Sequence, residues 1–545
     1  MSPEWMQGAP SPYSKVLVAN RGEIAVRVLQ AAREAGLSSV AVYSESDSGS
    51  LHVETADESV LLEGEGLDQT YLNGSAIIEA ARSTGADAIH PGYGFLSERA
   101  DFAREVESAG IRWIGPSAHA IETMGDKISA RTLMIESGVP VIPGDEIPIE
   151  EGADHLGALA SAAAKVGYPL LIKASAGGGG KGMRSVSVPK NLRSEFEAAA
   201  REASAAFGDG TVYIERLLTR ARHVEIQVLC DAHGGAIHLN ERDCSLQRRY
   251  QKVIEEAPSP AVDHATRQAM GEAAVTAARS VGYVGAGTVE FLLASNGEFF
   301  FLEMNTRIQV EHPVTESVTG LDLIEWMLKI AAGESPDLAD FEPKLNGASM
   351  EVRIYAEDPL KDFQPSPGEL TDVHWPEDGV RVDTWVENGS EVSAHYDPMI
   401  AKLIVHGKDR HDALTKLKAA LAETRLMGIA TNLDYLRQVV AQQSFADGVV
   451  STRALESFQF KPSVAEVVKP GTYTTVQDYP GRVGYWNIGV PPSGPMDDYA
   501  FRIANRIVGN HTEAAGLEAT LIGPSLKFHK DSVVALTGAL TDATL

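Results

Sequence analysis

The sequence predicts a chain of α/β and α+β domains that ends in a separate β-rich segment. From Lys15 to Gly115, short apolar runs alternate with helical patterns, which is typical of a parallel sheet covered by helices. After Pro140 the pattern changes to several strands around a glycine run, and a segment rich in Gly and Pro begins near 462. We expect several compact units, because 545 residues exceed what one hydrophobic core usually holds.

The first region is predicted to repeat a strand–helix–strand unit. Its expected strands are KVLVA, SVAVYS, ADAIH and RWIG. Its expected helices carry Ile24, Val28, Ala31 and Ala35 at helical spacing, cover 75–83, and follow Ser97. The loops NRGE at 20–23 and HPGYGFLSE at 90–98 follow strands, so we expect both at a ligand crevice.

Composition excludes several classes of function. With 47 Lys and Arg against 75 Asp and Glu, the net charge of -28 argues against a nucleic-acid or anionic-membrane partner. No apolar run approaches membrane-spanning length. The two cysteines, Cys230 and Cys244, are too few for a disulfide framework and lack the spacing of a zinc site, which favours a cytoplasmic location.

The segment GTVEFLLASNGEFFFLEMN predicts a hairpin with carboxylates at its centre. A two-residue type I′ turn at Asn296-Gly297 places Glu290 directly opposite Glu303. Two facing carboxylates destabilise a hairpin unless a cation or a shared proton lies between them. Oxygen ligands from Glu290, Glu303 and Asn305 favour Mg²⁺ or Mn²⁺ over zinc. The alternative is a longer loop that shifts the register and turns both carboxylates to solvent.

Polar residues continue at every second position after this hairpin. On an extended backbone, Glu303, Asn305, Arg307, Gln309 and Glu311 share one face. Arg307 and Gln309 suit a small oxyanion, and Glu311 is placed to remove its proton. The alternative is a solvated edge strand.

The segment PLLIKASAGGGGKGMRSV places a glycine-rich loop between two strands. Consecutive glycines allow backbone N–H groups to hold phosphates, with charge supplied by Lys173, Lys181 and Arg184. Ser175 and Gly182 do not fit a Walker A motif, and no helix is expected after the loop. The alternative is a flexible surface loop. Further on, ERDCSLQRRYQKVIEE alone is typical of a salt-bridged surface strand.

These segments together resemble the biotin carboxylase family of the ATP-grasp superfamily. KVLVANRGEIAVRV, HPGYGFLSE, MGDK, IKASAGGGGKGM, RHVEIQVL, ERDCSLQRR, EEAPSP, GAGTVEFL and FLEMNTRIQVEHPVTE occur in that order. Prolines at positions 3, 10 and 12 predict a disordered leader at 1–13. The resemblance implies an N-terminal α/β domain at 14–125, an ATP-grasp domain at 126–335 with a mobile lid at about 141–213, and a β-rich C-terminal domain at 346–460.

The resemblance also implies residue roles. ATP is expected near Lys127, Lys173, Gly179, Gly180, Glu215, Arg216, Leu217, Leu218, His223, Glu290 and Glu303. The metal ligands are expected to be Glu290, Glu303 and Asn305, and bicarbonate is expected at Lys252, Arg307, Gln309 and the backbone of Val310. Glu311 is the expected base, and Arg353 is expected to bind biotin and stabilise its enolate. Tyr250 departs from the family, which commonly has His there near the nucleotide.

The segment 466–545 resembles the opening of the carboxyltransferase domain of urea carboxylases. That domain is longer than this segment, so we expect it to be truncated, with the apolar run VVKPGTYTTV lacking partner strands. The sequence contains no Met-Lys-Met to carry biotin, so biotin is not expected to be attached to this chain.

The resemblance implies carboxylation of biotin by ATP and bicarbonate, with free biotin or a biotinylated carrier domain as partner. Urea, converted to allophanate, is the expected final acceptor, and a homo-oligomer is compatible with the sequence. Guanidine, a related amide or an acyl-CoA remains an alternative acceptor. A non-catalytic nucleotide-binding regulator is a further alternative, disfavoured by the intact Glu290, Glu303, Arg307, Glu311 and Arg353.

Overall fold

The computed structural model describes residues 12–147, 155–174, 184–207, 210–334, 338, 341 and 343–544. Contacts divide the chain into two compact units, Met1–Phe458 and Gln459–Leu545. The predicted leader at 1–13 lies almost wholly outside the described residues, and so does the glycine run of the predicted lid.

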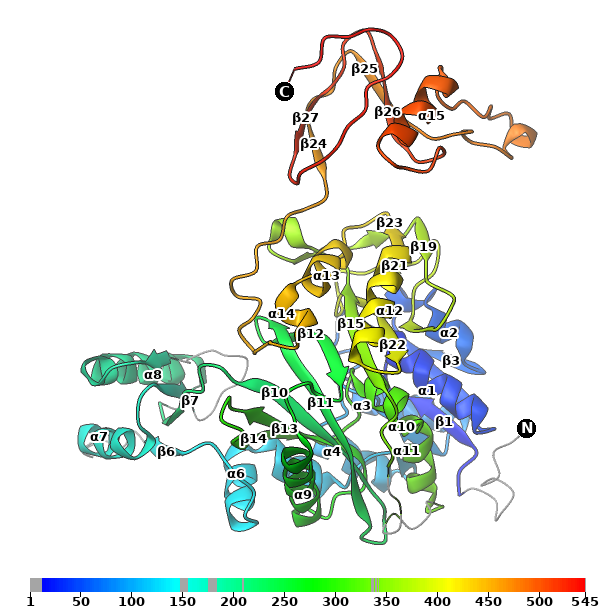
Figure 1. Ribbon diagram of the computed structural model, residues 1–545. Helices are drawn as coiled ribbons and strands as arrows, with labels where there is room; N and C mark the ends of the chain where they lie inside the picture. The colour runs from blue at the N-terminus through cyan, green and yellow to red at the C-terminus, as the bar shows by residue number, and fades with distance from the viewer. Residues whose placement is uncertain are drawn as a thin grey trace. The chain divides into compact units, whose positions relative to one another are not determined.

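The first unit begins with the predicted parallel sheet, in the order β3-β2-β1-β4-β5 (Figure 1). Its strands are β1 (Lys15–Val18), β2 (Ser38–Tyr43), β3 (Glu58–Leu61), β4 (Ala88–His90) and β5 (Arg112–Trp113). The sequence analysis missed β3, an edge strand whose mostly exposed residues form no apolar run. The loops after β1 and β4 lie at the same edge of the sheet, because the carboxyl ends of parallel strands meet there.

Six helices accompany this sheet among the described residues. They are α1 (Gly22–Glu34), α2 (Leu51–Thr55), α3 (Gly74–Thr84), α4 (Ala100–Ser108), α5 (Ala118–Gly125) and α6 (Lys127–Glu136), with a 3-10 turn at Glu45–Asp47. The predicted helix with Ile24, Val28 and Ala31 at helical spacing is α1, and these residues are buried.

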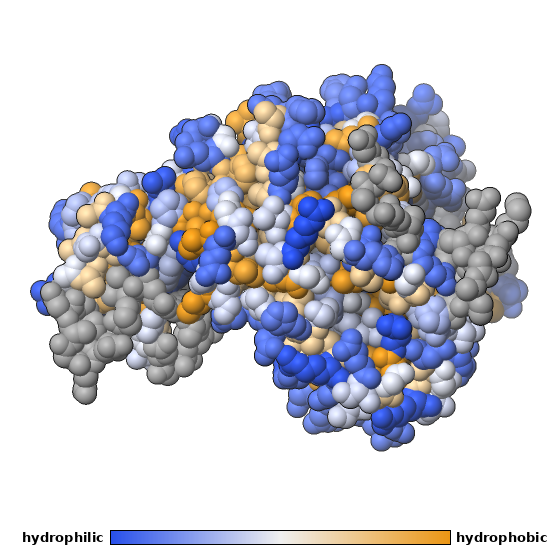
Figure 2. All heavy atoms as spheres, turned by 90° about the horizontal axis from the view of Figure 1, so that it is seen from below, coloured by the Kyte–Doolittle hydropathy of each residue, from blue (hydrophilic) through white to orange (hydrophobic). Residues whose placement is uncertain are grey.

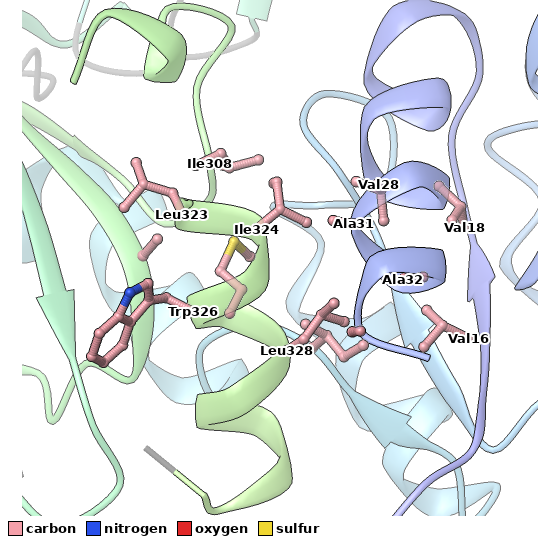
Figure 3. Packing of buried hydrophobic residues seen from close by; sticks show 14 of the residues in the cluster. Val16, Val18, Val28, Ala31, Ala32, Ile308, Leu323, Ile324, Trp326 and Leu328 are labelled. Atoms are coloured by element: carbon pink, nitrogen blue, oxygen red, sulfur yellow. The ribbon is translucent and has the colours of Figure 1, made fainter. Parts of the chain in front are cut away.

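The core joins this sheet to the region that follows. Val28 and Ala31 of α1 face Ile324 and Leu328 of α11 (Leu323–Ala332), with Val16 and Val18 of β1 behind them (Figure 3). Burial of such aliphatic side chains fixes α1, and therefore the NRGE loop at its start, against the central region.

A four-stranded sheet follows, in the order β6-β9-β7-β8. Its strands are β6 (Gly144–Ile147), β7 (Leu170–Ala174), β8 (Arg184–Val186) and β9 (Val212–Arg216). The helices α7 (His155–Val166) and α8 (Leu192–Phe207) pack on it, after a 3-10 turn at Pro189–Asn191 (Figure 1). A strand, β8, begins at Arg184 just after the undescribed glycine run, as expected from the absence of a helical pattern.

An eight-stranded antiparallel sheet forms the centre of the unit, in the order β14-β13-β10-β11-β12-β15-β22-β20. The strands are β10 (Arg222–Cys230), β11 (Ala236–Arg248), β12 (Gln251–Ala257), β13 (Gly285–Leu293), β14 (Phe299–Asn305), β15 (Ala348–Tyr355), β20 (Val380–Thr384) and β22 (Met399–Gly407). The pairing of β12 with β15, for example Ile254 with Val352, makes regions 126–335 and 346–460 parts of one sheet.

Helices and short strands complete the first unit. The helices are α9 (His264–Ser280), α10 (His312–Thr319), α12 (Arg410–Glu423), α13 (Leu433–Val440) and α14 (Gln443–Ala446). The short strands are β16 (Glu357–Asp358), β17 (Gln364–Pro365), β18 (Gly368–Glu369), β19 (Asp372–His374), β21 (Glu391–Val392) and β23 (Arg425–Met427), with a 3-10 turn at Pro359–Lys361.

The second unit contains two strand pairs and one helix, α15 (Asp498–Ile507). Strand β24 (Ala465–Lys469) pairs with β27 (Ser525–Phe528), and β25 (Tyr473–Gln477) pairs with β26 (Gly516–Thr520), beside a 3-10 turn at Trp486–Ile488. The expectation that VVKPGTYTTV lacks partner strands is therefore wrong, because later residues of the same segment pair with it. Its apolar side chains nevertheless remain exposed, for example Val467 and Val476.

The surface is mostly hydrophilic on the face shown in Figure 2, with hydrophobic residues in patches between hydrophilic ones. This agrees with the large negative net charge. Among the described residues, no helix has both the length and the apolar character needed to cross a bilayer.

Candidate active site

Glu290 on β13 and Glu303 on β14 lie directly opposite each other, as predicted. Glu290 is buried, whereas the side chain of Glu303 retains exposure. Desolvation and the charge of Glu290 raise the pKa of Glu303. Among the described residues, no hydrogen bond or ion pair neutralises Glu303, so the repulsion expected from the sequence persists.

The turn that creates this opposition differs from the prediction. The N–H of Ala294 donates to the carbonyl oxygen of Glu298 (2.8 Å), so the loop has three residues, 295–297, instead of two. Gly297 has φ +87, as the left-handed position of such a loop requires. The longer loop pairs Phe291 with Phe301, and a bulge next to Glu290 restores the predicted register.

Glu290 accepts hydrogen bonds from three side chains. Its Oε1 accepts from Lys252 Nζ (3.0 Å), Asn305 Nδ2 (2.9 Å) and Gln309 Nε2 (2.7 Å). Its Oε2 lies 2.9 Å from His223 Nε2. Burial opposes the charge of His223, but Glu290 raises the pKa of this histidine to about 9. The ionised Glu290 is thus held between two cations.

Lys252 on β12 contacts three carboxylates. Its Nζ donates to Glu225 Oε2 (2.6 Å), Glu290 Oε1 (3.0 Å) and Glu311 Oε1 (2.5 Å). Burial opposes the charge on Lys252, yet these carboxylates raise its pKa well above the usual value. Although burial also opposes ionisation of the carboxylates, Lys252 holds the pKa values of Glu225, Glu290 and Glu311 below their usual range.

Arg242 on β11 is the buried centre of this network, and the sequence analysis missed it. Its side chain has no solvent exposure. It donates to Glu225 Oε1 (2.6 Å), Gln227 Oε1 (2.7 Å), Thr315 Oγ1 (3.0 Å), Thr288 Oγ1 (3.0 Å) and Gln309 Oε1 (2.7 Å). The surface-strand interpretation of ERDCSLQRR is therefore wrong at Arg242, because opposed acidic and amide residues on neighbouring strands satisfy a buried guanidinium.

The polar residues after Glu303 do not continue on an extended strand, contrary to the prediction. Strand β14 ends at Asn305, and Glu311 is the residue before α10. Pro313 at the start of this helix fits its first turn, where no N–H partner is needed. The side chains of Gln309 and Glu311 still reach the network, because the chain turns back over the sheet.

Arg307 is held at the edge of this cluster. Its Nε donates to Glu98 Oε2 (2.9 Å), and its NH2 donates to Asn305 Oδ1 (2.9 Å). Glu98 ends the loop HPGYGFLSE, which the sequence analysis placed at a ligand crevice without assigning this partner. The first parallel sheet therefore contributes directly to the candidate site.

Arg353 on β15 reaches Glu311 from the other side. Its NH2 donates to Glu311 Oε2 (2.8 Å), and its Nε donates to Glu255 Oε1 (2.6 Å). Each oxygen of Glu311 thus contacts a different cation, Lys252 or Arg353. Next to it, the carbonyl oxygen of Val310 accepts from Lys402 Nζ (2.8 Å). Glu255 begins the motif EEAPSP, but no role was assigned to it, and Lys402 belongs to none of the motifs that carry the resemblance.

The residues expected around ATP lie at two places. Lys173 on β7 forms an ion pair with Glu215 on β9 (2.6 Å). The run Glu215, Arg216, Leu217 and Leu218 leads out of β9 toward β10, where His223 lies near Glu290. Lys127 is the first residue of α6. Gly179 and Gly180 lie outside the described residues.

Tyr250 occupies the turn between β11 and β12. It is 76% exposed, and both Arg249 (φ +51) and Tyr250 (φ +68) adopt the left-handed conformation of a two-residue hairpin turn. The ring therefore projects from a turn near Lys252 in the chain, and it makes no contribution to the buried network.

The donor set at the hairpin fits a hard divalent cation. Glu303 retains an unneutralised carboxylate opposite Glu290, and Asn305 adds an amide at the end of the same strand. An ion between the two carboxylates would remove the repulsion that raises the pKa of Glu303. Although burial opposes its charge, Lys252 and His223 lower the pKa of Glu290, which favours the ionised form that a metal ligand requires.

The arrangement can bind a small anion beside a base. Lys252, Arg307 and Arg353 supply positive charge around Glu311, whose lowered pKa keeps it ready to accept a proton. Lys252 links Glu225 to Glu311, and Arg242 fixes Gln309 (2.7 Å). Such a combination can remove a proton from a bound oxyanion.

Family comparisons match nearly the whole chain. The profile "Biotin carboxylase, N-terminal domain" matches residues 12–121, and "Carbamoyl-phosphate synthase L chain, ATP binding domain" matches 126–338. "Biotin carboxylase C-terminal domain" matches 351–457, and "Carboxyltransferase domain, subdomain A and B" matches 488–545.

Individual relatives differ in how much of the chain they match. Urea amidolyase of Saccharomyces cerevisiae is 51% identical over 536 residues, 98% of this chain and 29% of that protein. The mitochondrial methylcrotonoyl-CoA carboxylase subunit alpha of Dictyostelium discoideum is 51% identical over 444 residues, 81% of this chain and 63% of that protein. The chain therefore spans less than two thirds of the length of these curated relatives.

A solved structure covers the first unit. The biotin carboxylase domain dimer of Hydrogenobacter thermophilus 2-oxoglutarate carboxylase, in complex with MgADP, ADP and bicarbonate, is 44% identical with a TM-score of 0.75. The match covers 82% of this chain and 97% of that one.

Proposed function

The chain belongs to the biotin carboxylase family, and we propose that it carboxylates biotin by using ATP and bicarbonate. The observation that carries this proposal is the setting of Glu311. One of its oxygens contacts Lys252 (2.5 Å) and the other contacts Arg353 (2.8 Å). A base held between two cations can accept a proton from a bound anion and remain oriented while it does so.

Bicarbonate is proposed to bind at Lys252, Arg307, Gln309 and the backbone of Val310. Gln309 is fixed by its bonds to Arg242 and Glu290, and Arg307 is fixed by Glu98. Fixed donors of this kind hold an oxyanion without reorganising during the reaction. Glu311 then accepts the bicarbonate proton, and the resulting oxygen nucleophile attacks the γ-phosphate to give carboxyphosphate and ADP.

A divalent metal, held by Glu290, Glu303 and Asn305, would neutralise charge on the phosphates when bound. Lys127, Lys173, Glu215 and His223 are proposed to position the nucleotide, together with the run from Arg216 to Leu218. The glycine run with Gly179 and Gly180 is proposed to close over the phosphates. The bound ADP and bicarbonate named for the Hydrogenobacter thermophilus domain support both sites.

Arg353 is proposed to act in the second step. Breakdown of carboxyphosphate releases CO₂ and phosphate, and the phosphate takes the N1 proton of biotin. The guanidinium of Arg353, close to Glu311, is placed to balance the charge of the biotin enolate that attacks CO₂.

Urea is proposed as the final acceptor in the complete protein. The match to the methylcrotonoyl-CoA carboxylase subunit covers 81% of the chain, whereas the match to urea amidolyase covers 98% and so includes the second unit. This difference favours urea over an acyl-CoA. A biotinylated carrier domain is the proposed partner, and the dimer named for the Hydrogenobacter thermophilus domain supports a homo-oligomer. The two free, buried cysteines favour the cytoplasm as its location.

The test separates the two halves of this proposal. The protein is incubated with Mg-ATP, labelled bicarbonate and free biotin, with and without urea. Labelled carboxybiotin without allophanate is the expected result for this chain. Absence of bicarbonate-dependent ATP cleavage in a folded protein would refute the proposed carboxylation of biotin. Formation of allophanate that depends on urea would show that the second unit already contains an acceptor site.

A further inference from the structure

A second pair of carboxylates lies face to face in the eight-stranded sheet. Glu255 on β12 pairs directly with Glu351 on β15, and both side chains are fully buried. Side chains at such positions have Cβ atoms about 4.5–5.5 Å apart. Glu351 also pairs with Ile404 of β22, which packs against Val314 of α10. Helix α10 thus covers the pair and excludes water.

Arg353 neutralises only part of this pair. Its guanidinium donates to Glu255 Oε1 (2.6 Å) and to Glu311 Oε2 (2.8 Å), so its charge is divided between two carboxylates. The second oxygen of Glu255 and both oxygens of Glu351 have no hydrogen-bond partner in the part of the chain that the structure describes.

The other nearby cation is also engaged elsewhere. Lys402 on β22 donates to the carbonyl oxygen of Val310 (2.8 Å). Its Nζ lies 3.3 Å from Glu23 Oε2 and 3.5 Å from Asp383 Oδ2. Two ionised carboxylates at positions 255 and 351 would therefore outnumber the cations available to them, which is unfavourable without water.

We propose that Glu255 and Glu351 share one proton and that this pair positions Arg353 for the biotin step. The inference rests on the proposed function, in which Arg353 acts on the biotin enolate. With one proton shared, the pair carries a single negative charge. The guanidinium of Arg353 then lies between this charge and the single negative charge of Glu311. Glu351 is a positioning residue, because it acts through Glu255 and does not touch Arg353.

The surrounding charges agree with this assignment. Burial and then Glu255 raise the pKa of Glu351 well above the usual value, against the effect of Lys402. Burial raises the pKa of Glu255 to about 7 despite Arg353. The charged groups that act on the pair are Arg353 on β15, Lys402 on β22, Glu311 before α10 and Lys252 on β12. His312 is held neutral, because burial and Lys402 lower its pKa.

Infrared difference spectroscopy tests the shared proton directly. The wild type at about pH 8 should show the C=O stretch of a neutral, buried carboxylic acid, and Glu351→Gln should lack it. Glu256→Gln is the matched control, since Glu256 lies next on β12, contacts Arg410 and has a pKa of about 7. This control should keep the band. An unchanged band in Glu351→Gln would refute the shared proton.

Kinetics test the positioning of Arg353. Glu351→Gln keeps a donor toward Glu255, whereas Glu351→Leu removes it. The carboxybiotin formed per ATP cleaved should fall about tenfold in Glu351→Leu and less than about twofold in Glu351→Gln, while ATP cleavage without biotin is retained in both. Equal loss in both variants, or no loss in Glu351→Leu, would contradict the positioning role.

If Glu351→Leu does not fold, the infrared comparison still decides whether the proton is shared. A wild type without bicarbonate-dependent ATP cleavage would refute the proposed function alone, because the infrared result does not depend on activity.

Discussion

Replacing Lys252 by methionine would leave three buried carboxylates without their common cation. The ammonium lies 2.6, 3.0 and 2.5 Å from Glu225, Glu290 and Glu311, and only 13% of its side chain is exposed. Removal of one partner from a buried ion pair costs about 3–5 kcal/mol, because the remaining charge is left desolvated. Each carboxylate keeps one other cation, since Arg242, His223 and Arg353 lie near Glu225, Glu290 and Glu311, respectively. We therefore expect the free energy of unfolding to fall by about this amount for the three carboxylates together.

The loss should depend on pH. In the wild type the lowered pKa values of Glu225, Glu290 and Glu311 give stability that is present above the unfolded pKa and lost on acidification. In Lys252→Met the carboxylates should bind protons more readily when folded than when unfolded. The difference between the two proteins should therefore be small near about pH 4.5 and largest at about pH 7–8.

Guanidinium unfolding followed by circular dichroism measures this difference. The transition of the first unit is compared at both pH values, since a chain of two units need not unfold in one step. Lys416→Met is the control, because Lys416 forms an exposed pair with Asp412 (3.2 Å) and should change stability by less than about 0.5 kcal/mol. If Lys252→Met lowers the free energy of unfolding by less than about 1 kcal/mol, or by an amount independent of pH, Lys252 does not stabilise the three carboxylates as argued.

Further predictions concern the reaction. Glu303→Gln should abolish metal-supported ATP cleavage while leaving or slightly raising the unfolding temperature, because it removes the repulsion from Glu290; unchanged turnover at saturating Mg²⁺ would exclude the metal assignment. Glu311→Gln should stop bicarbonate-dependent ATP cleavage with or without biotin, whereas Arg353→Ala should retain part of that ATPase and lose carboxybiotin. If both variants lost ATP cleavage and carboxybiotin formation in equal proportion, Glu311 and Arg353 would not have separate roles. The wild type should use free biotin slowly and without saturation, because an untethered cofactor lacks an effective concentration of about millimolar or higher; saturation at micromolar biotin would contradict this.

Local patterns predicted much of the fold. Apolar runs located β1, β2 and β4, whose consecutive residues are mostly buried, and helical spacing located α1. β3 has no such run, and its assignment depends on pairing with β2, which the sequence of ESVL does not reveal. The opposition of Glu290 and Glu303 was predicted correctly, although the turn was not, because a bulge offset the additional loop residue.

The buried partners of the site could not be predicted in the same way. Arg242 lies in a segment rich in charge, which usually indicates a surface, and only the pairing of β11 with β10 brings Glu225 opposite it. Glu255 and Glu351 are almost a hundred residues apart, and the pairing of β12 with β15 places them together. The pairing of strands that are distant in the sequence therefore decides which charges are neutralised, and no single segment predicts this pairing.

Because β12 pairs with β15, the first unit cannot be divided between these strands without cutting one sheet. Lys252 and Arg353 sit on these hydrogen-bonded neighbours, so a crossover between them would combine two halves of one sheet from different parents and alter both cations around Glu311. A crossover after Phe458 separates no strand pair among the described residues. A hybrid chain joined after Phe458 should therefore keep every described strand pair of the first unit, whereas one joined between β12 and β15 should not.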